Sequence, residues 1–406
     1  MRLMTESTVK NEQLIIGLMS GSSLDGIDAA LVRVTGCCEA TTWTLVDFLS
    51  TPFKPEVKKH LLALFDYERC TVDKVCLMNS VLGELFAENA LAIVKQAGVN
   101  VEEIDAMGVW PQMVYHLPAR SNPKEILGYH LGACLQLGDL NVIVERTGIT
   151  TIGSFCARDI AVGGNGAPLT GLGDYIVYHH VERNRAIQNI GGIANVNLVL
   201  AAGGMDQVIG FDTGPGNMLI DSIVRHLTQE QWQYDHDGQM ASSGRVDSTL
   251  VNSFLEDPFI QQRPPKAAGR ENFGEHFTKA FLAEAETRKL SNNDIVATAT
   301  SLTVEAIAFN YEHFLLPYAP IHEVVIGGGG ALNPALMRML RERLRPIEIA
   351  TDDEYGIPSF AKEAIYMALI TNETLRGHAN NVSSVTGASR PVVMGLIAPA
   401  YRGIRV

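Results

Sequence analysis

The chain contains little cysteine. It has 6 cysteines among 406 residues, which is too few for a disulfide scaffold. None of them forms a C-x-x-C pair, and no set of cysteines and histidines has the spacing of zinc ligands. The six are Cys37, Cys38, Cys70, Cys76, Cys134 and Cys156. We therefore expect a reduced, cytoplasmic protein.

The chain is also short of basic residues and of long apolar runs. Its 32 lysines and arginines face 45 acidic residues, giving a net charge of -13, which argues against nucleic acid or an anionic membrane as a partner. No run approaches the ~18 consecutive apolar residues of a membrane span, and the first residues lack the apolar core of a signal peptide. A hydrophobic content of 46% nevertheless supports a large core, and the length favours two or three domains.

Two successive blocks of the sequence show the same order of elements. Apolar alternation predicts strands and 3.6-residue periodicity predicts helices, and each block opens with three strands in an antiparallel meander. The first block has strands at 13–19, 27–34, 42–48, 104–109 and 149–153, and helices at 55–65, 72–96 and 139–146. The second has strands at 185–190, 196–200, 208–212 and 323–326, and helices at 217–227, 248–255, 275–288, 300–314 and 334–344. We predict a duplicated α/β architecture, with domains at 12–183, completed by 358–406, and at 184–357.

Glycine-rich turns recur beside the predicted strands. Such turns let the backbone approach a ligand closely, and successive amides can hold phosphate oxygens. They are Gly17–Gly26, Gly163–Pro168, Asn189–Asn195, Phe211–Asn217 and Val325–Pro334. Any one of them could instead be a simple hairpin or helix cap. The P-loop and the G-x-G-x-x-G fingerprint are both absent from the sequence, which argues against Walker-type and Rossmann nucleotide sites.

Acidic residues accompany several of these turns. Asp25 and Asp28 belong to the first turn region, Asp212 ends a predicted strand before Thr-Gly-Pro-Gly, and Glu363 lies in AKEAI. Phosphoryl transfer needs a carboxylate to accept a proton and others to hold Mg²⁺. Asp212 could equally be a helix N-cap or an Asx-turn, and Glu363 an ordinary carboxylate on a helix surface. The loop Pro264–Arg270 carries two cations that could clamp a phosphate or sugar, or form a surface turn.

Taken together, these segments resemble the anhydro-N-acetylmuramic acid kinase family, including its relative levoglucosan kinase. The resemblance extends from Gly17 to Gly395. Its motifs are GLMSGSSLDGIDAALV, GGNGAPL, QNIGGIANV, GFDTGPGN, YDHDGQMASSG, PPKAAGREN, GGGGALNP and SVTGASRPVVMG. The resemblance implies the duplicated fold of actin, hexokinase and the sugar kinases, with two ribonuclease H-like domains and ATP in the cleft between them. Members of the family commonly pair, so we expect a homodimer.

The resemblance also implies an activity and the residues that perform it. The enzyme would open a 1,6-anhydro bond with water and transfer the γ-phosphate of ATP to O6, with Asp212 as the base and Mg²⁺ on the phosphates. The candidates for ATP and phosphate binding are Gly21, Ser22, Ser23, Asp25, Gly26, Asn189, Gly191, Gly192, Asn195, Gly214, Gly216, Asn217, Gly328, Gly329 and Asn333. The sugar-binding candidates are Gln112, Asp159, Gly166 and Lys266, and the metal candidates are Asp25 and Glu363.

The sequence departs from the family pattern on the sugar side. Val109–Met113 replaces S-H-G-Q-T and keeps only the glutamine, Ser154–Cys156 replaces D-F-R, and Ala267-Ala268 replaces Ser-Thr. Lost hydroxyl and guanidinium groups remove hydrogen bonds that discriminate between sugars. Three functions therefore remain open: an active anhydrosugar kinase with an altered substrate, an ATP-binding homologue with impaired catalysis, and an ordinary sugar kinase acting on a free hydroxyl.

Overall fold

The chain folds into two compact units. The computed structural model describes residues 10–21, 24–66, 70–118 and 124–401. Unit 1 comprises residues Met1–Val177 and Phe360–Val406, and unit 2 comprises Tyr178–Ser359. The predicted domain boundaries lie at 183/184 and 357/358, whereas the two units divide at 177/178 and 359/360.

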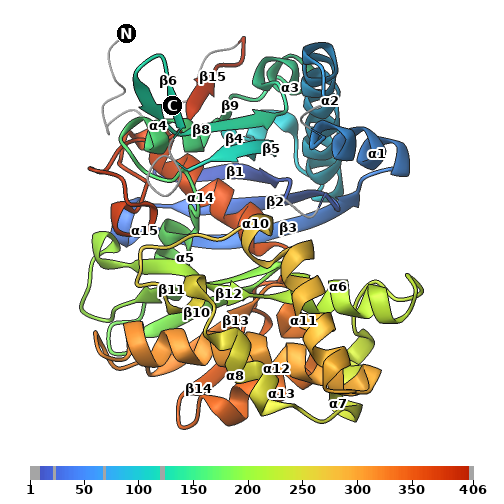
Figure 1. Cartoon of the computed structure of the whole chain (residues 1–406). Helices are drawn as coiled ribbons and strands as arrows, with labels where there is room; N and C mark the ends of the chain where they lie inside the picture. Colours follow the sequence, from blue (N-terminus) through green and yellow to red (C-terminus); the bar gives the residue numbers. More distant parts are fainter. Residues whose placement is uncertain (1–9, 22–23, 67–69, 119–123, 402–406) are drawn as a thin grey trace. The chain divides into compact units, whose positions relative to one another are not determined.

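The sheet of unit 1 has six strands in the order β15-β9-β4-β1-β2-β3 (Figure 1). Its strands are β1 (Glu12–Met19), β2 (Gly26–Thr35), β3 (Thr42–Pro52), β4 (Ala106–Trp110), β9 (Thr151–Gly153) and β15 (Leu396–Ala398). The meander β1-β2-β3 is antiparallel, and β4 and β9 continue from β1 in parallel. The strand β15, from the C-terminal segment, pairs antiparallel with β9.

The sheet of unit 2 repeats this topology with five strands in the order β12-β11-β10-β13-β14. They are β10 (Arg185–Ile190), β11 (Ile193–Val199), β12 (Ile209–Pro215), β13 (Glu323–Gly327) and β14 (Glu348–Thr351). Again the first three strands form an antiparallel meander, and the last two continue in parallel from the first. Five strands of unit 1, β9-β4-β1-β2-β3, match the five strands of unit 2 in order and direction, which confirms the predicted duplication.

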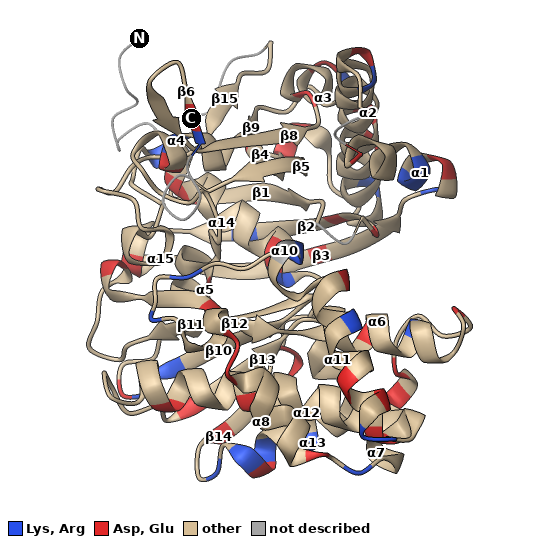
Figure 2. Cartoon of the chain, viewed as in Figure 1, with Lys and Arg blue, Asp and Glu red and all other residues tan. Residues whose placement is uncertain are grey.

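Helices pack on both sheets. Those of unit 1 are α1 (Pro55–Leu64), α2 (Val72–Gln96), α3 (Leu140–Thr147), α4 (Phe155–Ala161), α5 (Thr170–Tyr178), α14 (Lys362–Arg376) and α15 (Ser383–Thr386). Those of unit 2 are α6 (Asn217–Leu227), α7 (Gln239–Ser243), α8 (Ser248–Leu255), α9 (Pro258–Gln261), α10 (Arg270–Phe273), α11 (Glu275–Thr287), α12 (Asn292–Asn310) and α13 (Pro334–Arg343). Figure 2 shows acidic and basic residues interspersed on these helices, whereas the strands are largely uncharged.

Two regions differ from the sequence prediction. The helix expected from Thr300 begins at Asn292, because Ser291 and Asp294 form a capping box at its start. Between β4 and α3 the structure has four short strands that the apolar pattern did not indicate: β5 (Gln112–Leu117), β6 (Lys124–Ile126), β7 (Tyr129–Leu131) and β8 (Ala133–Leu137). All residues of β6 and β7 are exposed, so these strands carry no alternation of buried and exposed side chains.

One described helix, α2, is long and apolar enough by composition to cross a membrane. Half of its most apolar window is buried against the rest of unit 1. Leu82, Phe86 and Ile93 of this helix belong to the core around β1 and β2. Packing in that core accounts for its apolar character.

The helix α14 lies against the sheet of unit 1 at two glycines. A Cβ atom on Gly17 of β1 would overlap the Ala364 carbonyl oxygen, and one on Gly108 of β4 would overlap the Thr371 side chain. The two strands are parallel neighbours with Gly17 paired to Gly108. The glycines therefore allow the close approach that places Glu363, in the first turn of α14, near the end of β1.

Candidate active site

The glycine turns of unit 2 meet at one edge of its sheet. The strands β10, β12 and β13 run in the same direction, because β11 is antiparallel to both β10 and β12 and β13 is parallel to β10. Their carboxyl ends, at Ile190, Pro215 and Gly327, therefore share an edge. In α/β sheets this is the edge where ligands bind.

The turn after β10 is joined to the start of α6 by backbone hydrogen bonds. The amides of Gly216 and Met218 donate to the Gly192 carbonyl, each at 3.1 Å, and the Asn217 amide donates to the Gly191 carbonyl at 2.7 Å. A Cβ on Gly216 would overlap the Gly191 oxygen, so this glycine allows the contact. The amides of Gly216 and Asn217 thus have partners within the protein, which leaves the start of α6 with fewer free donors than the sequence suggested.

The loop after β13 closes on the same turn. Gly328 has a φ of +77°, and a Cβ there would lie 2.6 Å from the Asn189 side-chain oxygen and 2.8 Å from the Ile190 carbonyl. Asn217 donates from its side-chain nitrogen to the Ile190 carbonyl at 3.0 Å. Gly329 lies beside it, because a Cβ there would be 3.2 Å from that nitrogen. The structure therefore brings Asn189, Gly191, Gly192, Gly216, Asn217, Gly328 and Gly329 together.

The remaining nucleotide candidates of unit 2 have structural partners. Asn333 is the N-cap of α13, and its side-chain oxygen accepts from the Ala335 amide at 3.0 Å and the Leu336 amide at 3.2 Å. Asn195 pairs with both Asn189 and Asp212 in the sheet, at an irregularity of the register. Gly214 has a φ of +147°, which favours glycine at this point of β12. Their roles toward a nucleotide stay predictions.

Asp212 lies in β12, and the loop Pro264–Arg270 holds it. Its side-chain oxygen accepts a hydrogen bond from the Ala268 amide at 2.6 Å, and its own amide donates to the Lys266 carbonyl at 3.1 Å. The Asp212 side chain is half-buried. Because the first bond comes from the backbone, it does not depend on the alanines that replace Ser-Thr in the family pattern.

Lys266 lies in the core of unit 2. It is 5% exposed, and its ammonium group donates to the carbonyls of Phe259 at 3.0 Å and Ile260 at 2.8 Å. Burial lowers the pKa of this lysine to about 7, whereas Asp212 and Asp257 act in the opposite direction. We expected Lys266 to contact a sugar. These contacts favour a different role, in which the lysine supports the loop that holds Asp212.

In unit 1, Gln112 fastens the turn that follows β1. Gln112 is fully buried, and its amide oxygen accepts from the Ser20 hydroxyl at 2.8 Å. Its amide nitrogen donates to the Gly21 carbonyl at 3.3 Å, while the Ser20 hydroxyl is also 3.1 Å from the Gly26 carbonyl. These bonds satisfy the glutamine within the protein. Ser22 and Ser23 lie outside the described residues.

Carboxylates gather near the start of α14. The pKa of Glu363 is raised, mainly through loss of solvation and further by Asp28 and Asp174, while Lys362 opposes the shift. The Glu363 side chain is itself exposed. The pKa of Asp28 is raised by burial and by Asp25, against a hydrogen bond from Ser50. Asp25 itself is exposed and lies 3.5 Å from the Lys58 ammonium.

Asp159 and Gly166 belong to a structural network. Asp159 is fully buried, and its carboxylate accepts from the Gly166 amide at 2.9 Å, the Asn381 side chain at 2.8 Å and the Thr386 hydroxyl at 2.8 Å. Gly166 has a φ of +74° and packs on Ile160. These bonds join the Gly163–Pro168 turn to the C-terminal segment, and they leave Asp159 little capacity to bind a sugar.

Two of the residues that depart from the family pattern are buried. Trp110 ends β4 and is 9% exposed, and Cys156 is 1% exposed, with its thiol 3.6 Å from the Gln136 side-chain oxygen. A hydrogen bond with the neighbouring Cys134, together with burial, raises the pKa of the Cys156 thiol, which argues against a reactive thiolate. Neither side chain offers a charged group to a ligand.

Comparison with known proteins identifies the family. The profile of anhydro-N-acetylmuramic acid kinase matches residues 13–400. The chain belongs to this family. An anhydro-N-acetylmuramic acid kinase of Caldanaerobacter subterraneus subsp. tengcongensis is 43% identical over 96% of this chain and 98% of its own length. One of Bacillus thuringiensis subsp. konkukian is 39% identical over 94% and 98%.

Solved structures add little. Component A of the (R)-2-hydroxyglutaryl-CoA dehydratase of Acidaminococcus fermentans covers 89% of this chain and 97% of its own, at 11% identity and a TM-score of 0.45. Family membership makes the chain a kinase, a phosphotransferase with an alcohol group as acceptor.

Asp174 and Lys362 are residues near the candidate site that the sequence did not suggest. The Lys362 ammonium lies 3.8 Å from the Asp174 carboxylate, and Asp174 also accepts a hydrogen bond from the Tyr366 hydroxyl. All three are buried. An acid in T-G-L-G-D-Y and a lysine before Glu363 carry no motif that would have joined them.

Proposed function

We propose that the protein is an ATP-dependent kinase that opens the 1,6-anhydro bond of a sugar with water and phosphorylates O6. The position of Asp212 carries this proposal. It lies on β12 opposite Asn195, in the segment Phe211–Asn217 that is one of the glycine turns, and the Ala268 amide orients its carboxylate at 2.6 Å. A half-buried, oriented carboxylate is suited to accept a proton from water or a hydroxyl. The substrate is 1,6-anhydro-N-acetylmuramic acid or a sugar like levoglucosan.

The reaction balances with one water molecule. Asp212 accepts a proton as the water oxygen bonds to the anomeric carbon, and the bond from that carbon to O6 breaks. The released O6 bonds to the γ-phosphorus of ATP, and ADP leaves. The product is the opened sugar 6-phosphate. We assign the phosphates of ATP to the turn Asn189–Asn195 and the adenosine to Gly327–Gly330 with Asn333, because the glycines of both turns permit close approach of the backbone.

Mg²⁺ suits the carboxylates of unit 1. Magnesium prefers oxygen ligands and usually keeps several waters, so one or two carboxylates are enough to hold it beside phosphates. Asp25 and Glu363 remain our candidates, with Asp28 near both of them. When bound, the ion would neutralise charge on the transferred phosphoryl group. These residues contribute negative charge, and Lys58 partly balances it at Asp25.

Two other functions stay open because the residues on the sugar side are altered. An ATP-binding protein with impaired catalysis is favoured by Trp110 and Cys156, which place buried, uncharged side chains where the family pattern has polar ones. An ordinary sugar kinase is possible because a base such as Asp212 could also activate an alcohol. The homodimer and the cytoplasmic location remain predictions.

ADP release separates these alternatives. The purified protein is given Mg-ATP with 1,6-anhydro-N-acetylmuramic acid, levoglucosan, glucose or N-acetylglucosamine. The proposal expects ADP release stimulated by an anhydro sugar and lost in Asp212→Asn. Stimulation by hexoses alone supports the ordinary kinase. A thermal shift with Mg-ATP but no stimulation by any sugar supports the impaired homologue.

A further inference from the structure

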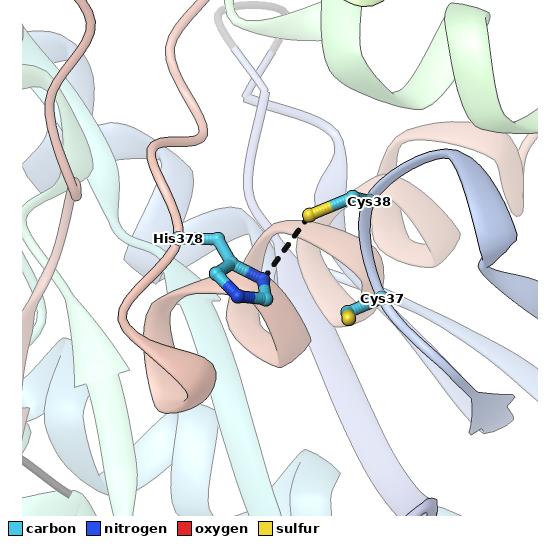
Figure 3. A group of neighbouring side chains, drawn as sticks. All are labelled: Cys37, Cys38 and His378. Atoms are coloured by element: carbon cyan, nitrogen blue, oxygen red, sulfur yellow. Dashed lines mark hydrogen bonds between the residues drawn. The ribbon is translucent and has the colours of Figure 1, made fainter. Parts of the chain in front are cut away.

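Two cysteines and a histidine that are far apart in the sequence meet in unit 1. The possible ligand atoms of Cys37, Cys38 and His378 all lie within 4.8 Å of one another, and all three residues are half-buried (Figure 3). The Cys38 sulfur lies 3.2 Å from Nδ1 of His378, across a sequence separation of 340 residues. Among the described residues, this is the one such group of His, Cys, Asp and Glu side chains. The spacing of the cysteines and histidines gave no indication of it.

Local backbone conformation brings these side chains together. Gly36 and Cys38 have φ values of +78° and +54°, so the chain bends sharply where β2 passes into β3. This bend lets two consecutive cysteines face one place, whereas consecutive side chains in a strand point to opposite faces. On the other side, α14 ends at Arg376, and Gly377, with a φ of +75°, turns the chain toward His378.

Glu373 adds a carboxylate beside Cys38 and His378. It lies in the last turn of α14, and its carboxylate is 3.6 Å from the Cys38 sulfur and 3.1 Å from Nδ1 of His378. It is 1% exposed, and no lysine or arginine is paired with it among the described residues. The Cys38 amide at 3.2 Å and the Asn372 side chain at 2.9 Å donate hydrogen bonds that orient this carboxylate.

Three ligand separations are close to those of a tetrahedral metal centre. Ligand bonds to zinc of ~2.3 Å for sulfur and ~2.0–2.2 Å for nitrogen or oxygen place the ligand atoms about 3.3–3.8 Å apart. The three measured separations among Cys38, His378 and Glu373 are 3.2, 3.6 and 3.1 Å. We propose that Cys37, Cys38, His378 and Glu373 form a binding site for Zn²⁺ or a similar thiophilic divalent cation.

A catalytic cysteine pair explains the geometry less well. In a Cys-His-acid triad, the two nitrogens of the imidazole ring contact the thiol and the acid separately. Here Nδ1 of His378 contacts both the Cys38 sulfur and the Glu373 carboxylate. A ring nitrogen that lies close to both a sulfur and a carboxylate has the arrangement expected when all three groups bind the same metal ion. A redox pair of the adjacent cysteines is the remaining alternative, which the experiment below decides.

The cation would have a structural role. It joins the turn after β2 to the end of α14, which otherwise meet through hydrogen bonds of Glu373 and Asn372. The Ser20–Gly26 turn lies at the opposite end of β2, and a strand of 10 residues spans about 30 Å. The bound cation would therefore stabilise unit 1 without contacting the substrate, and this inference does not depend on the proposed function.

Metal titration of the full-length protein tests the proposal. The reduced protein is freed of metal with a chelator and titrated with Co²⁺, whose thiolate complexes absorb in the near ultraviolet and whose tetrahedral complexes absorb in the visible. We expect saturation near one Co²⁺ per chain, displacement by Zn²⁺, and a melting temperature raised by Zn²⁺. Cys38→Ser and His378→Ala should each weaken Co²⁺ binding at least tenfold. Cys76→Ser, which alters an exposed cysteine outside the cluster, is the matched control and should bind as the parent does.

Three outcomes would overturn the proposal. The first is the absence of a thiolate band in the reduced protein, and the second is a band that persists unchanged in both Cys38→Ser and His378→Ala. The third is a disulfide between Cys37 and Cys38, found by thiol counting and peptide mass, in a protein that binds no Co²⁺ after reduction. Circular dichroism of each variant shows that it is folded. If Cys38→Ser does not fold, Glu373→Gln replaces it, and weaker Co²⁺ binding is again expected.

Discussion

The two units have the same strand order, yet the corresponding edges of their sheets are built from different groups. In unit 2 this edge is formed largely by backbone: glycines at 191, 192, 216, 328 and 329 let three loops approach one another closely. In unit 1 the corresponding turn is held by side chains, above all by Gln112 and Ser20. Close approach of the backbone suits a polyanion, and in unit 1 the buried hydrogen bonds of Gln112 instead fix the conformation of the turn. The shared topology thus supports two kinds of surface.

The acids differ in the same way. In unit 2, Asp212 lies on the third strand, opposite Asn195, and a backbone amide orients it. In unit 1, Asp28 lies on the second strand, opposite Ser50, and burial raises its pKa. The two carboxylates are therefore not equivalent in the duplication. We infer that unit 2 supplies the base, whereas the acidic residues of unit 1 are the candidates for binding Mg²⁺.

Removing each acid in turn gives the largest expected effect. Asp212→Asn should lower kcat by about 10²–10⁴-fold, because an amide cannot accept the proton that general base catalysis transfers. Asp28→Asn should have a smaller effect on kcat. Asp206→Asn, an exposed acid of unit 2, serves as the control. Equal losses in Asp212→Asn and Asp28→Asn would show that the two units do not divide the chemistry as proposed.

The backbone contacts of unit 2 can be tested with a pair of glycines. Gly216→Ala should lower the free energy of unfolding by about 1–3 kcal/mol, because its Cβ would overlap the Gly191 carbonyl oxygen. Gly191→Ala places its Cβ at ordinary contact distances, 3.6 Å from the Ile193 oxygen and 3.7 Å from the Asn189 side chain. It should unfold as the parent does in urea. A stable Gly216→Ala variant would mean that the turn can move away from α6.

The lowered pKa of Lys266 predicts that the free energy of unfolding changes with pH. Burial lowers its pKa from 10.5 to about 7, so between these values the unfolded chain keeps a proton that the folded chain has released. The free energy of unfolding contributed by this group therefore rises with pH in that window. Relative to Lys266→Met, the parent should gain on the order of 1–2 kcal/mol between pH 7 and 9. Urea titrations at the two pH values measure this gain, and a constant difference would contradict the assignment.

The smallest effect is expected at the surface of unit 1. Lys58 and Asp25 form a pair at 3.5 Å with 44% and 76% of their side chains exposed. Exposed pairs of this kind contribute about 0–1 kcal/mol, so Lys58→Met should leave the melting temperature nearly unchanged.

Asp25→Asn should instead raise the Mg²⁺ concentration needed for half-maximal activity. An unchanged Mg²⁺ requirement would remove Asp25 from the metal candidates.

Local patterns were enough to predict most of the fold. The helix Val72–Gln96 was predicted with its observed bounds, and the two meanders followed from apolar alternation. The exposed strands β6 and β7 were missed because no buried face marks them. The glycine turns were recognisable as a set: four of them follow a strand, and Gly163–Pro168 follows α4. The shared direction of β10, β12 and β13 explains why the turns of unit 2 meet.

Side-chain partners distant in sequence could not be predicted. Nothing beside Asp159 indicates that Asn381 and Thr386 satisfy its carboxylate, and a lysine in a Pro-Pro loop gives no sign of burial. The neighbours of Lys266 include the rings of Phe259 and Phe314, which lie on separate elements. Likewise, Cys37 and Cys38 meet His378 only because α14 packs across the sheet. These contacts follow from tertiary packing, which short motifs do not encode.

The mass of the reaction product tests the central claim most directly. The protein is incubated with Mg-ATP and 1,6-anhydro-N-acetylmuramic acid, and the sugar products are analysed by mass spectrometry. Hydrolytic phosphorylation with Asp212 as base predicts a product that has gained both one water and one phosphoryl group, and that is absent with Asp212→Asn. A product that has gained the phosphoryl group alone, or one that forms equally with Asp212→Asn, would contradict the account.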